Sequence, residues 1–342
     1  MSHAAHLKDL RDELKTRKLD GFLIPRTDEF QSEFLAPYAE RLGWLTGFTG
    51  SAGLGVVLAD KAYVVTDGRY TLQIKAEVDA KLYQTGDIFA DKAADWIADN
   101  TKKGMVIGYD PLLHTPAQIE EFEKTLSSKG IKLEAVDANP VDVVWKNQPS
   151  RPDDKVFLFD GKYAGRTSSE KRDLIAEKIK GFDLDHFIIT QPDSIAWLLN
   201  IRGCDVAHTP VALSYADIDK AGNVTWYIDP SKVPDDVRAA LGNHVTIQAP
   251  SQLEKDMTAL AAKDQKLGLD YKRSPVWFKS VLGNDTAQLC DITDPVIAPR
   301  AAKLPAELDA SRMAHKRDGQ VLTKFFKWFA DEAPKGNLSE LD

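Results

Sequence analysis

Cysteine, long apolar runs and a targeting segment are all scarce or missing in this 342-residue sequence. Its two cysteines, Cys204 and Cys290, lie far apart, so we expect no disulfide framework and a reducing compartment. No apolar run approaches the ~18 residues that a membrane span needs, and residues 1–18 lack the apolar core of a secretory signal. These absences predict a cytoplasmic protein with no membrane partner.

An excess of basic residues is also missing. The chain has 44 Lys and Arg against 52 Asp and Glu, which gives a formal net charge of −8. Nucleic acid binding needs a concentrated basic surface, so we expect no nucleic acid partner. Hydrophobic residues make up 43% and charged residues 28%, the balance of a globular protein. At roughly 100–200 residues per domain, this length predicts about two domains.

Motifs for metal-dependent or nucleophilic catalysis are absent as well. The seven histidines form no H-E-x-x-H, and the sequence has no C-x-x-C, G-x-S-x-G or phosphate-binding loop. His3 and His6 lie in the terminal segment, where we expect them to be solvated. Asp205 and His208 are the most ligand-like pair, but polar loop residues more often serve turns and caps. We therefore expect no catalytic residue and no metal ligand in this chain.

What is present is a pattern of short apolar runs between amphipathic segments. Charged residues alternate with leucines at helical spacing over residues 7–19. The expected strands of the first half are residues 21–25, 54–58, 62–65, 105–109 and 131–136. Its further expected helices are residues 71–77, 91–100 and 115–129. This alternation predicts an α/β domain.

The second half repeats the order of the first. Its expected helices are residues 167–180, 194–200, 233–241 and 252–262. Its expected strands are residues 186–190, 211–215, 224–228 and 267–270. Each half reads helix, strand, helical turn, glycine-bearing loop and strand pair, which indicates two copies of one domain type. Prolines 140, 149 and 152 place the boundary at about residue 150, so we predict domains at 1–150 and 151–303.

The last segment, residues 304–342, differs from both halves. A long helical pattern over residues 305–331 carries an apolar face that needs a partner surface. That face consists of Leu308, Met313, Val321, Leu322, Phe325, Phe326 and Phe329. The sequence therefore suggests a truncated third domain; the alternative is that this helix packs back onto the second domain.

Two arginines stand in loops where function commonly lies. Arg69 follows Asp67 and Gly68 at the end of a predicted strand. Its guanidinium could hold a peptide carbonyl or carboxylate by paired hydrogen bonds. The residues alone favour a structural ion pair with Asp67 or another acid. Arg202 could face a ligand cleft, although a role in bracing its own loop is favoured.

Several motifs resemble those of one enzyme family in the family's own order. The strings at residues 47–53 (GFTGSAG) and 66–70 (TDGRY) resemble the first domain of Xaa-Pro aminopeptidases, also called aminopeptidase P. Residues 197–203 (WLLNIRG) with Pro210 look like their second domain, and residues 314–319 (AHKRDG) look like the helix that opens their catalytic domain. The resemblance extends over nearly the whole chain.

This resemblance implies a fold and an activity. Two creatinase N-terminal-like (ribonuclease H-like) α/β domains with mixed sheets would precede a catalytic domain of the pita-bread fold. That domain would hold two Mn²⁺ ions and hydrolyse the bond between an N-terminal residue and a following proline. The implied metal ligands lie beyond Asp342, so none is assigned to this chain. Arg69 matches a substrate-binding arginine, and peptides with proline at position two and a homodimer partner are implied.

Two alternatives of other classes remain open at this point. The chain could be a stand-alone module for dimerisation or peptide binding. It could also belong to a creatinase or a proline dipeptidase, which resemble the motifs around Gly47 and Arg69 less well.

Overall fold

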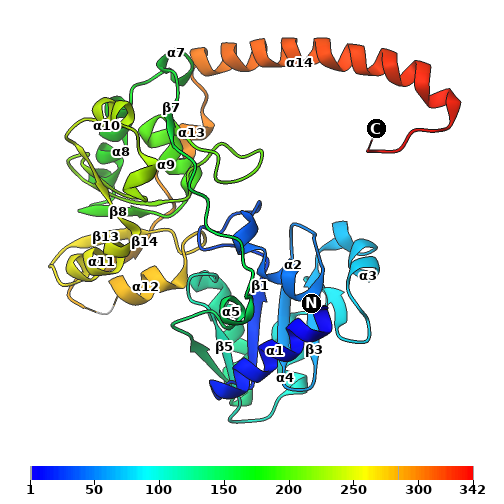
Figure 1. Cartoon of the computed structure of the whole chain (residues 1–342). Coiled ribbons are helices and arrows are strands. Elements are labelled where there is room, and N and C mark those ends of the chain that lie inside the picture. The colour runs from blue at the N-terminus through cyan, green and yellow to red at the C-terminus, as the bar shows by residue number, and fades with distance from the viewer. Residues whose placement is uncertain (1, 284, 342) are drawn as a thin grey trace.

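The apolar strand segments assemble into two six-stranded mixed sheets, as the computed structural model of residues 2–283 and 285–341 shows (Figure 1). In the first sheet, β1 lies in the middle, antiparallel to β2 and parallel to β5. The strand order is β4 (Gln84–Asp87), β3 (Ala62–Thr66), β2 (Leu54–Leu58), β1 (Gly21–Pro25), β5 (Val106–Tyr109) and β6 (Lys132–Ala135).

Helices cover both faces of this sheet, which explains why its central strands are continuous apolar runs. Side chains alternate between two cores: Phe22 and Ile24 face one, and Leu23 faces the other. The first core is shared with α1 and α6, and the second with α4 and α5. The helices of this unit are α1 (His3–Thr16), α2 (Arg41–Thr46), α3 (Gln73–Glu77), α4 (Ala93–Asn100), α5 (Pro116–Leu126) and α6 (Pro140–Val144).

The second sheet repeats the first strand for strand. Its order is β12 (Val245–Gln248), β11 (Val224–Tyr227), β10 (Tyr215–Asp219), β8 (His186–Ile189), β13 (Lys266–Leu269) and β14 (Gln288–Asp291). Each neighbouring pair has the same parallel or antiparallel sense as its counterpart in the first sheet. The predicted repetition of one domain type is therefore confirmed at the level of topology.

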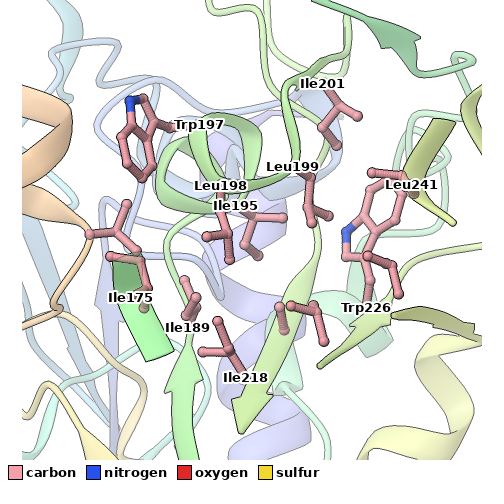
Figure 2. Packing of buried hydrophobic residues seen from close by; sticks show 14 of the residues in the cluster. Ile175, Ile189, Ile195, Trp197, Leu198, Leu199, Ile201, Ile218, Trp226 and Leu241 are labelled. Carbon is pink, nitrogen blue, oxygen red and sulfur yellow. The ribbon is translucent and has the colours of Figure 1, made fainter. Parts of the chain in front are cut away.

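A dense apolar core fills the second unit. Trp226 is fully buried there, and its indole N–H donates to Ser214 Oγ at 2.9 Å. Figure 2 shows α9 (Pro192–Leu199) lying over the sheet, with Ile195, Leu198 and Leu199 against the strand residues Ile189 and Ile218. The remaining helices of this unit are α7 (Gly161–Ala164), α8 (Ser168–Gly181), α9 (Pro192–Leu199), α10 (Asp235–Leu241), α11 (Leu253–Ala261), α12 (Val276–Leu282) and α13 (Ile297–Ala301).

Short elements complete the chain. A two-stranded ribbon pairs β7 (Phe157–Leu158) with β9 (Ile201–Arg202). Six 3₁₀ turns are described: η1 (Pro37–Ala39), η2 (Gly68–Tyr70), η3 (Ser127–Lys129), η4 (Pro230–Lys232), η5 (Pro250–Gln252) and η6 (Ala333–Lys335).

Two sequence-based expectations are wrong. The strand expected at 211–215 begins at Tyr215, because the Asp205 carboxylate accepts a hydrogen bond from the Leu213 N–H at 2.7 Å and holds the preceding segment as a loop. His6 is buried rather than solvated. Its ring stacks on Trp44 with centroids 4.0 Å apart, and its Nδ1 lies 2.9 Å from the Trp44 carbonyl oxygen.

The C-terminal helix α14 (Pro305–Glu332) begins beside α7 and then runs away from both units (Figure 1). The aromatic side chains on its second half are exposed. They are Phe325, Phe326, Trp328 and Phe329. The alternative in which this helix packs back onto the second unit is therefore not the arrangement observed.

Candidate functional site

Arg69 lies on a short turn at the end of a central strand. Strand β3 ends at Thr66, whose hydroxyl donates to the Ala52 carbonyl at 2.6 Å and ties the turn to the preceding glycine-rich loop. The Asp67 carboxylate then accepts a hydrogen bond from the Arg69 N–H at 3.0 Å and so begins η2. The side chain of Arg69 therefore extends from the turn that follows the end of β3.

The guanidinium of Arg69 pairs with the same carboxylate. Its Nη2 donates to Asp67 Oδ2 at 2.8 Å and its Nε to Oδ1 at 3.1 Å, so the ion pair favoured from the residues alone is present. The hydrogen bond from Arg69 lowers the pKa of Asp67. Nη1 lies 3.7 Å from Glu33 Oε1 and makes no hydrogen bond within residues 2–283 and 285–341. Because the Arg69 side chain is 58% exposed, that nitrogen is free to meet a ligand.

Three loops converge around this arginine. Ser51 Oγ lies 2.9 Å from Tyr70 Oη, and this side-chain hydrogen bond lowers the pKa of Tyr70. Ser51 Oγ also lies 3.2 Å from Glu33 Oε1. The loop path requires glycine at position 50, since a Cβ there would lie 2.3 Å from Phe48 Cζ and 2.9 Å from Tyr70 Cγ. The site can thus offer one cation and the hydroxyls of Ser51 and Tyr70 to an extended ligand.

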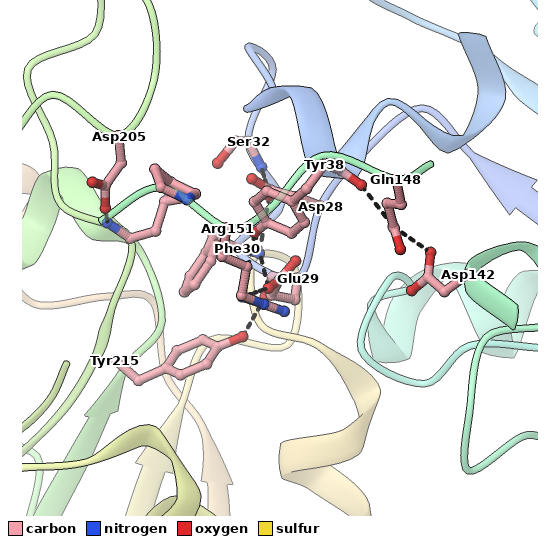
Figure 3. A network of polar contacts seen from close by, with 12 residues as sticks. Asp28, Glu29, Phe30, Ser32, Tyr38, Asp142, Gln148, Arg151, Asp205 and Tyr215 are labelled. Atoms are coloured by element: carbon pink, nitrogen blue, oxygen red, sulfur yellow. Dashed lines mark hydrogen bonds and ion pairs between the residues drawn. The ribbon is translucent and has the colours of Figure 1, made fainter. Parts of the chain in front are cut away.

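A second polar cluster, which the sequence did not reveal, joins the two units (Figure 3). Glu29 accepts hydrogen bonds from Tyr38 Oη at 3.0 Å and pairs with Arg151 at 2.5 Å. Its backbone carbonyl accepts from Tyr215 Oη of the second unit at 2.7 Å. Beside it, Asp28 is completely buried.

Asp28 is the unusual member of this cluster. Its Oδ1 accepts from the backbone N–H groups of Phe30 and Ser32 at 3.0 and 2.9 Å. Its Oδ2 has no hydrogen-bond partner in the part of the chain that the structure describes. Burial raises the pKa of Asp28 to about 6, with the nearby Glu29 adding to the rise and the Ser32 and Phe30 N–H groups opposing it.

This raised pKa predicts how the variant Asp28→Asn depends on pH. The buried carboxyl binds its proton more tightly in the folded chain than in the unfolded chain, so the wild type loses stability as pH rises from about 4 to 6. Asparagine keeps the oxygen that accepts from Phe30 and Ser32 but carries no charge. We therefore compare the free energy of unfolding of Asp28→Asn with that of wild type at each pH. The variant's free energy relative to wild type is expected to be higher at pH 8 than at pH 4 by on the order of 2–3 kcal/mol. Urea unfolding at both pH values measures this difference; a pH-independent difference would contradict the prediction.

The other sequence candidates are structural. Arg202 Nη1 donates to the Ile201 carbonyl at 2.7 Å, and its guanidinium lies 3.9 Å from the centre of the Phe159 ring, so it braces its loop. Asp205 forms a buried ion pair with Lys232 at 2.5 Å, while His208 lies exposed in the loop. Nowhere in the described residues do three His, Cys, Asp or Glu side chains converge as a metal site.

Comparisons with known proteins place both halves of the chain in one domain family. Residues 6–143 and residues 147–307 each match a model of the Creatinase/Prolidase N-terminal domain. Both halves of the chain therefore belong to the creatinase/prolidase N-terminal domain family. Among its relatives are probable Xaa-Pro aminopeptidases P, so the resemblance noted in the sequence is confirmed.

Two of these relatives are fungal. The protein of Pyrenophora teres f. teres is 34% identical over 350 residues, which cover 98% of this chain and 53% of that protein. The protein of Pyricularia oryzae is 34% identical over 361 residues, which cover 100% of this chain and 58% of that protein. The chain thus spans about half the length of the curated relatives it matches.

A solved structure agrees over the same extent. The X-prolyl aminopeptidase of Caenorhabditis elegans, described as a cytosolic enzyme with a di-nuclear active site, superposes with a TM-score of 0.90 at 27% identity. The match covers 98% of this chain and 57% of that one. Among the described residues, we find no helix with the length and apolar character of a membrane span.

Proposed function

We propose that this chain is the N-terminal, non-catalytic part of an Xaa-Pro aminopeptidase, a metallohydrolase that removes the N-terminal residue preceding proline. The observation that carries this proposal is the extent of the match: 98% of the chain aligns with about half the length of such an enzyme. In it, residues 1–150 and 151–303 are two domains that shape substrate access and dimerisation. Residues 304–342 begin the catalytic domain, and α14 is its opening helix. The complete enzyme would work in the cytosol as a homodimer.

The two metal ions of such an enzyme, which we propose to be Mn²⁺, do not fit any group of residues described in this chain. We therefore assign them to the remainder of the longer enzyme, where they would polarise the peptide carbonyl and activate water. No step of that chemistry is assigned to residues 1–342. The contribution of this part is to bind and orient the peptide.

Assay of the purified 342-residue chain tests this assignment. With added Mn²⁺, we expect no release of the first residue from a peptide with proline at position two, because no described cluster can hold the metal. The longer enzyme under the same conditions serves as the positive control. Cleavage by the 342-residue chain itself would contradict the proposal.

Arg69 is our proposed substrate contact. Its Nη1 group is exposed and free of protein hydrogen bonds among the described residues, and Glu33 and Asp67 hold the side chain in one place. A guanidinium in this position can donate to a peptide carbonyl or carboxylate, from its own subunit's cleft or across the dimer.

In the complete enzyme, the variant Arg69→Ala is therefore expected to lower kcat/KM for an Xaa-Pro peptide by about tenfold or more, as expected for loss of a charged hydrogen bond. Arg69→Lys keeps the charge but loses the paired donors, so an intermediate value is expected. Lys75→Ala, which removes an exposed cation from nearby α3, is the matched control. Steady-state kinetics give these values, and an Arg69→Ala enzyme with unchanged kcat/KM would show that the arginine serves only its ion pair.

A stand-alone dimerisation module is the second candidate. In that case the exposed apolar face of α14 would pack against a second copy of the chain. The length of the reading frame in the source gene separates the two proposals directly.

A further inference from the structure

A pocket of about 380 Å³ opens in the first unit, apart from the loops around Arg69. Helices α4 and α5 form its walls through Ala94 and Phe122, and the sheet contributes Leu54. Ile88 and Phe89, which follow β4, form another part of the lining, and His114 completes it. Most of these side chains are apolar. The lining therefore offers water few hydrogen bonds and favours the binding of an apolar ligand.

The pocket occupies the place where open α/β sheets commonly bind ligands. After β1 the chain adds β2, β3 and β4 on one side and then crosses to add β5 and β6 on the other. Strand β1 is therefore the point at which the strand order reverses. Pro25 ends β1, and residues 88–89 and 114 follow the ends of β4 and β5, so the lining gathers at the edge where the parallel strands end.

His114 is the buried side chain among the polar residues that line this pocket. Its side chain is buried, and its Nε2 has no hydrogen-bond partner within the described parts of the chain. Burial lowers the pKa of His114 to about 3, so the ring is neutral at physiological pH. A neutral imidazole has one donor and one acceptor nitrogen, and a hydroxyl group can satisfy either. A buried nitrogen without a hydrogen-bond partner raises the free energy of the folded chain. A ligand hydroxyl that bonds to this nitrogen would remove that cost.

The charge at the rim is balanced. Lys92 and Glu121 both line the pocket, and their side chains pair with each other at 3.0 Å. Neither a cation nor an anion is therefore favoured at the entrance. The volume lies at the small end of the range of about 300–1,000 Å³ that holds small-molecule ligands.

From these features we propose that the pocket binds a small uncharged ligand with one aromatic ring and one hydroxyl group. The ring would lie among Leu54, Phe89 and Phe122, and the hydroxyl would reach His114. The backbone carbonyl of His114 accepts a hydrogen bond from the Val276 N–H of the second unit at 2.7 Å. A ligand that orders His114 would therefore also affect this hydrogen bond between the two units.

Titration of phenol into the ¹⁵N-labelled 342-residue chain, followed by NMR, tests this proposal. Saturable shifts are expected at the amides of residues 88–89, 94, 114 and 122. The variant His114→Phe keeps a ring of similar size without the nitrogen. It is expected to weaken phenol binding by about fivefold or more and to leave toluene binding nearly unchanged.

A second pair of variants tests where phenol binds. Thr125→Trp places an indole on the pocket wall and is expected to abolish the shifts. Asp99→Trp adds the same indole at an exposed position of α4 and is expected to leave binding unchanged. If Thr125→Trp fails to fold by circular dichroism, Ala94→Trp replaces it, because Ala94 lies on the opposite wall. Shifts in the wild type that stay linear with phenol concentration, or equal binding by the filled variant, would overturn the proposal.

Discussion

Replacing Asp205 by alanine is expected to lower the free energy of unfolding by about 3–5 kcal/mol. The Asp205 side chain is fully buried, and that of Lys232, its partner at 2.5 Å, is only 6% exposed. Without the carboxylate, the Lys232 ammonium keeps, among the described residues, only the hydrogen bond to the Pro152 carbonyl at 3.3 Å. The Leu213 N–H loses its acceptor at the same time. A buried, nearly unpaired charge is the main cause of the expected loss, which urea unfolding measures.

The double variant Asp205→Leu with Lys232→Met separates charge from packing. Because it removes both charges, it is expected to recover at least half of the stability that Asp205→Ala loses. Asp12→Ala, which removes one partner of the exposed Lys8–Asp12 pair, is the surface control and should leave the unfolding midpoint unchanged. A loss below about 1 kcal/mol for Asp205→Ala would mean that water reaches Lys232 and compensates its charge.

The central strands could be predicted from the sequence because burial on both faces leaves a simple signal. Strands β1, β2 and β3 are buried at every residue, and their bounds match the apolar runs to within one residue. The repetition of topology was visible for the same reason. Equivalent strands occupy equivalent buried positions, even though the residues that fill them differ.

Three outer strands, β4, β12 and β14, were missed because they have no such signal, whereas the outer strand β6 was predicted. Strand β4 reads Gln-Thr-Gly-Asp, and β14 reads Gln-Leu-Cys-Asp. Each lies at the edge of a sheet, pairs on one side only and is partly exposed, so polar residues are tolerated. Helix α6 lies within the predicted linker, because Pro140 signals a boundary in the sequence but is the first residue of the helix, capped by Asn139.

The residues of the candidate site also differ in how well the sequence alone predicts them. A strand that ends in Asp67-Gly68-Arg69 marks a loop cation together with its ion-pair partner Asp67, whereas Glu33 reaches Arg69 from a distant loop. Asp28 and Glu29 could not be singled out, because their environment comes from residues far along the chain. Arg151 and Tyr215 contact Glu29 across separations of more than a hundred residues. The sequence signal for this cluster is limited to two adjacent acidic residues, Asp28 and Glu29, that follow shortly after a buried strand.

The contact between the two units depends on Phe30, which leaves the first unit and enters the core of the second. Its side chain is 4% exposed, and its ring lies 4.8 Å from that of Tyr215. The Phe30 carbonyl accepts a hydrogen bond from Gln191 Nε2 at 3.0 Å. The same loop carries Glu33, which lies beside Arg69. One segment therefore fixes the second unit against the first and helps to place the proposed substrate contact.

The variant Phe30→Ala is accordingly expected to lose about 3–5 kcal/mol of unfolding free energy, the cost of a cavity in a packed core. Phe34→Ala removes the same ring four residues later, at a side chain that is 58% exposed, and should change stability by less than about 0.5 kcal/mol. Denaturant unfolding of the two variants side by side gives the comparison.

Hydrogen exchange shows whether this loss opens the contact itself. The N–H groups of Val276 and Trp277 donate across it to the carbonyls of His114 and Pro111, at 2.7 and 3.0 Å. In Phe30→Ala both amides are expected to exchange faster by a larger factor than the amides of β1, because local opening needs less free energy than global unfolding. Equal acceleration everywhere would instead mean that Phe30 stabilises the second core without coupling the units. In that case the position of Arg69 would depend on the first unit alone.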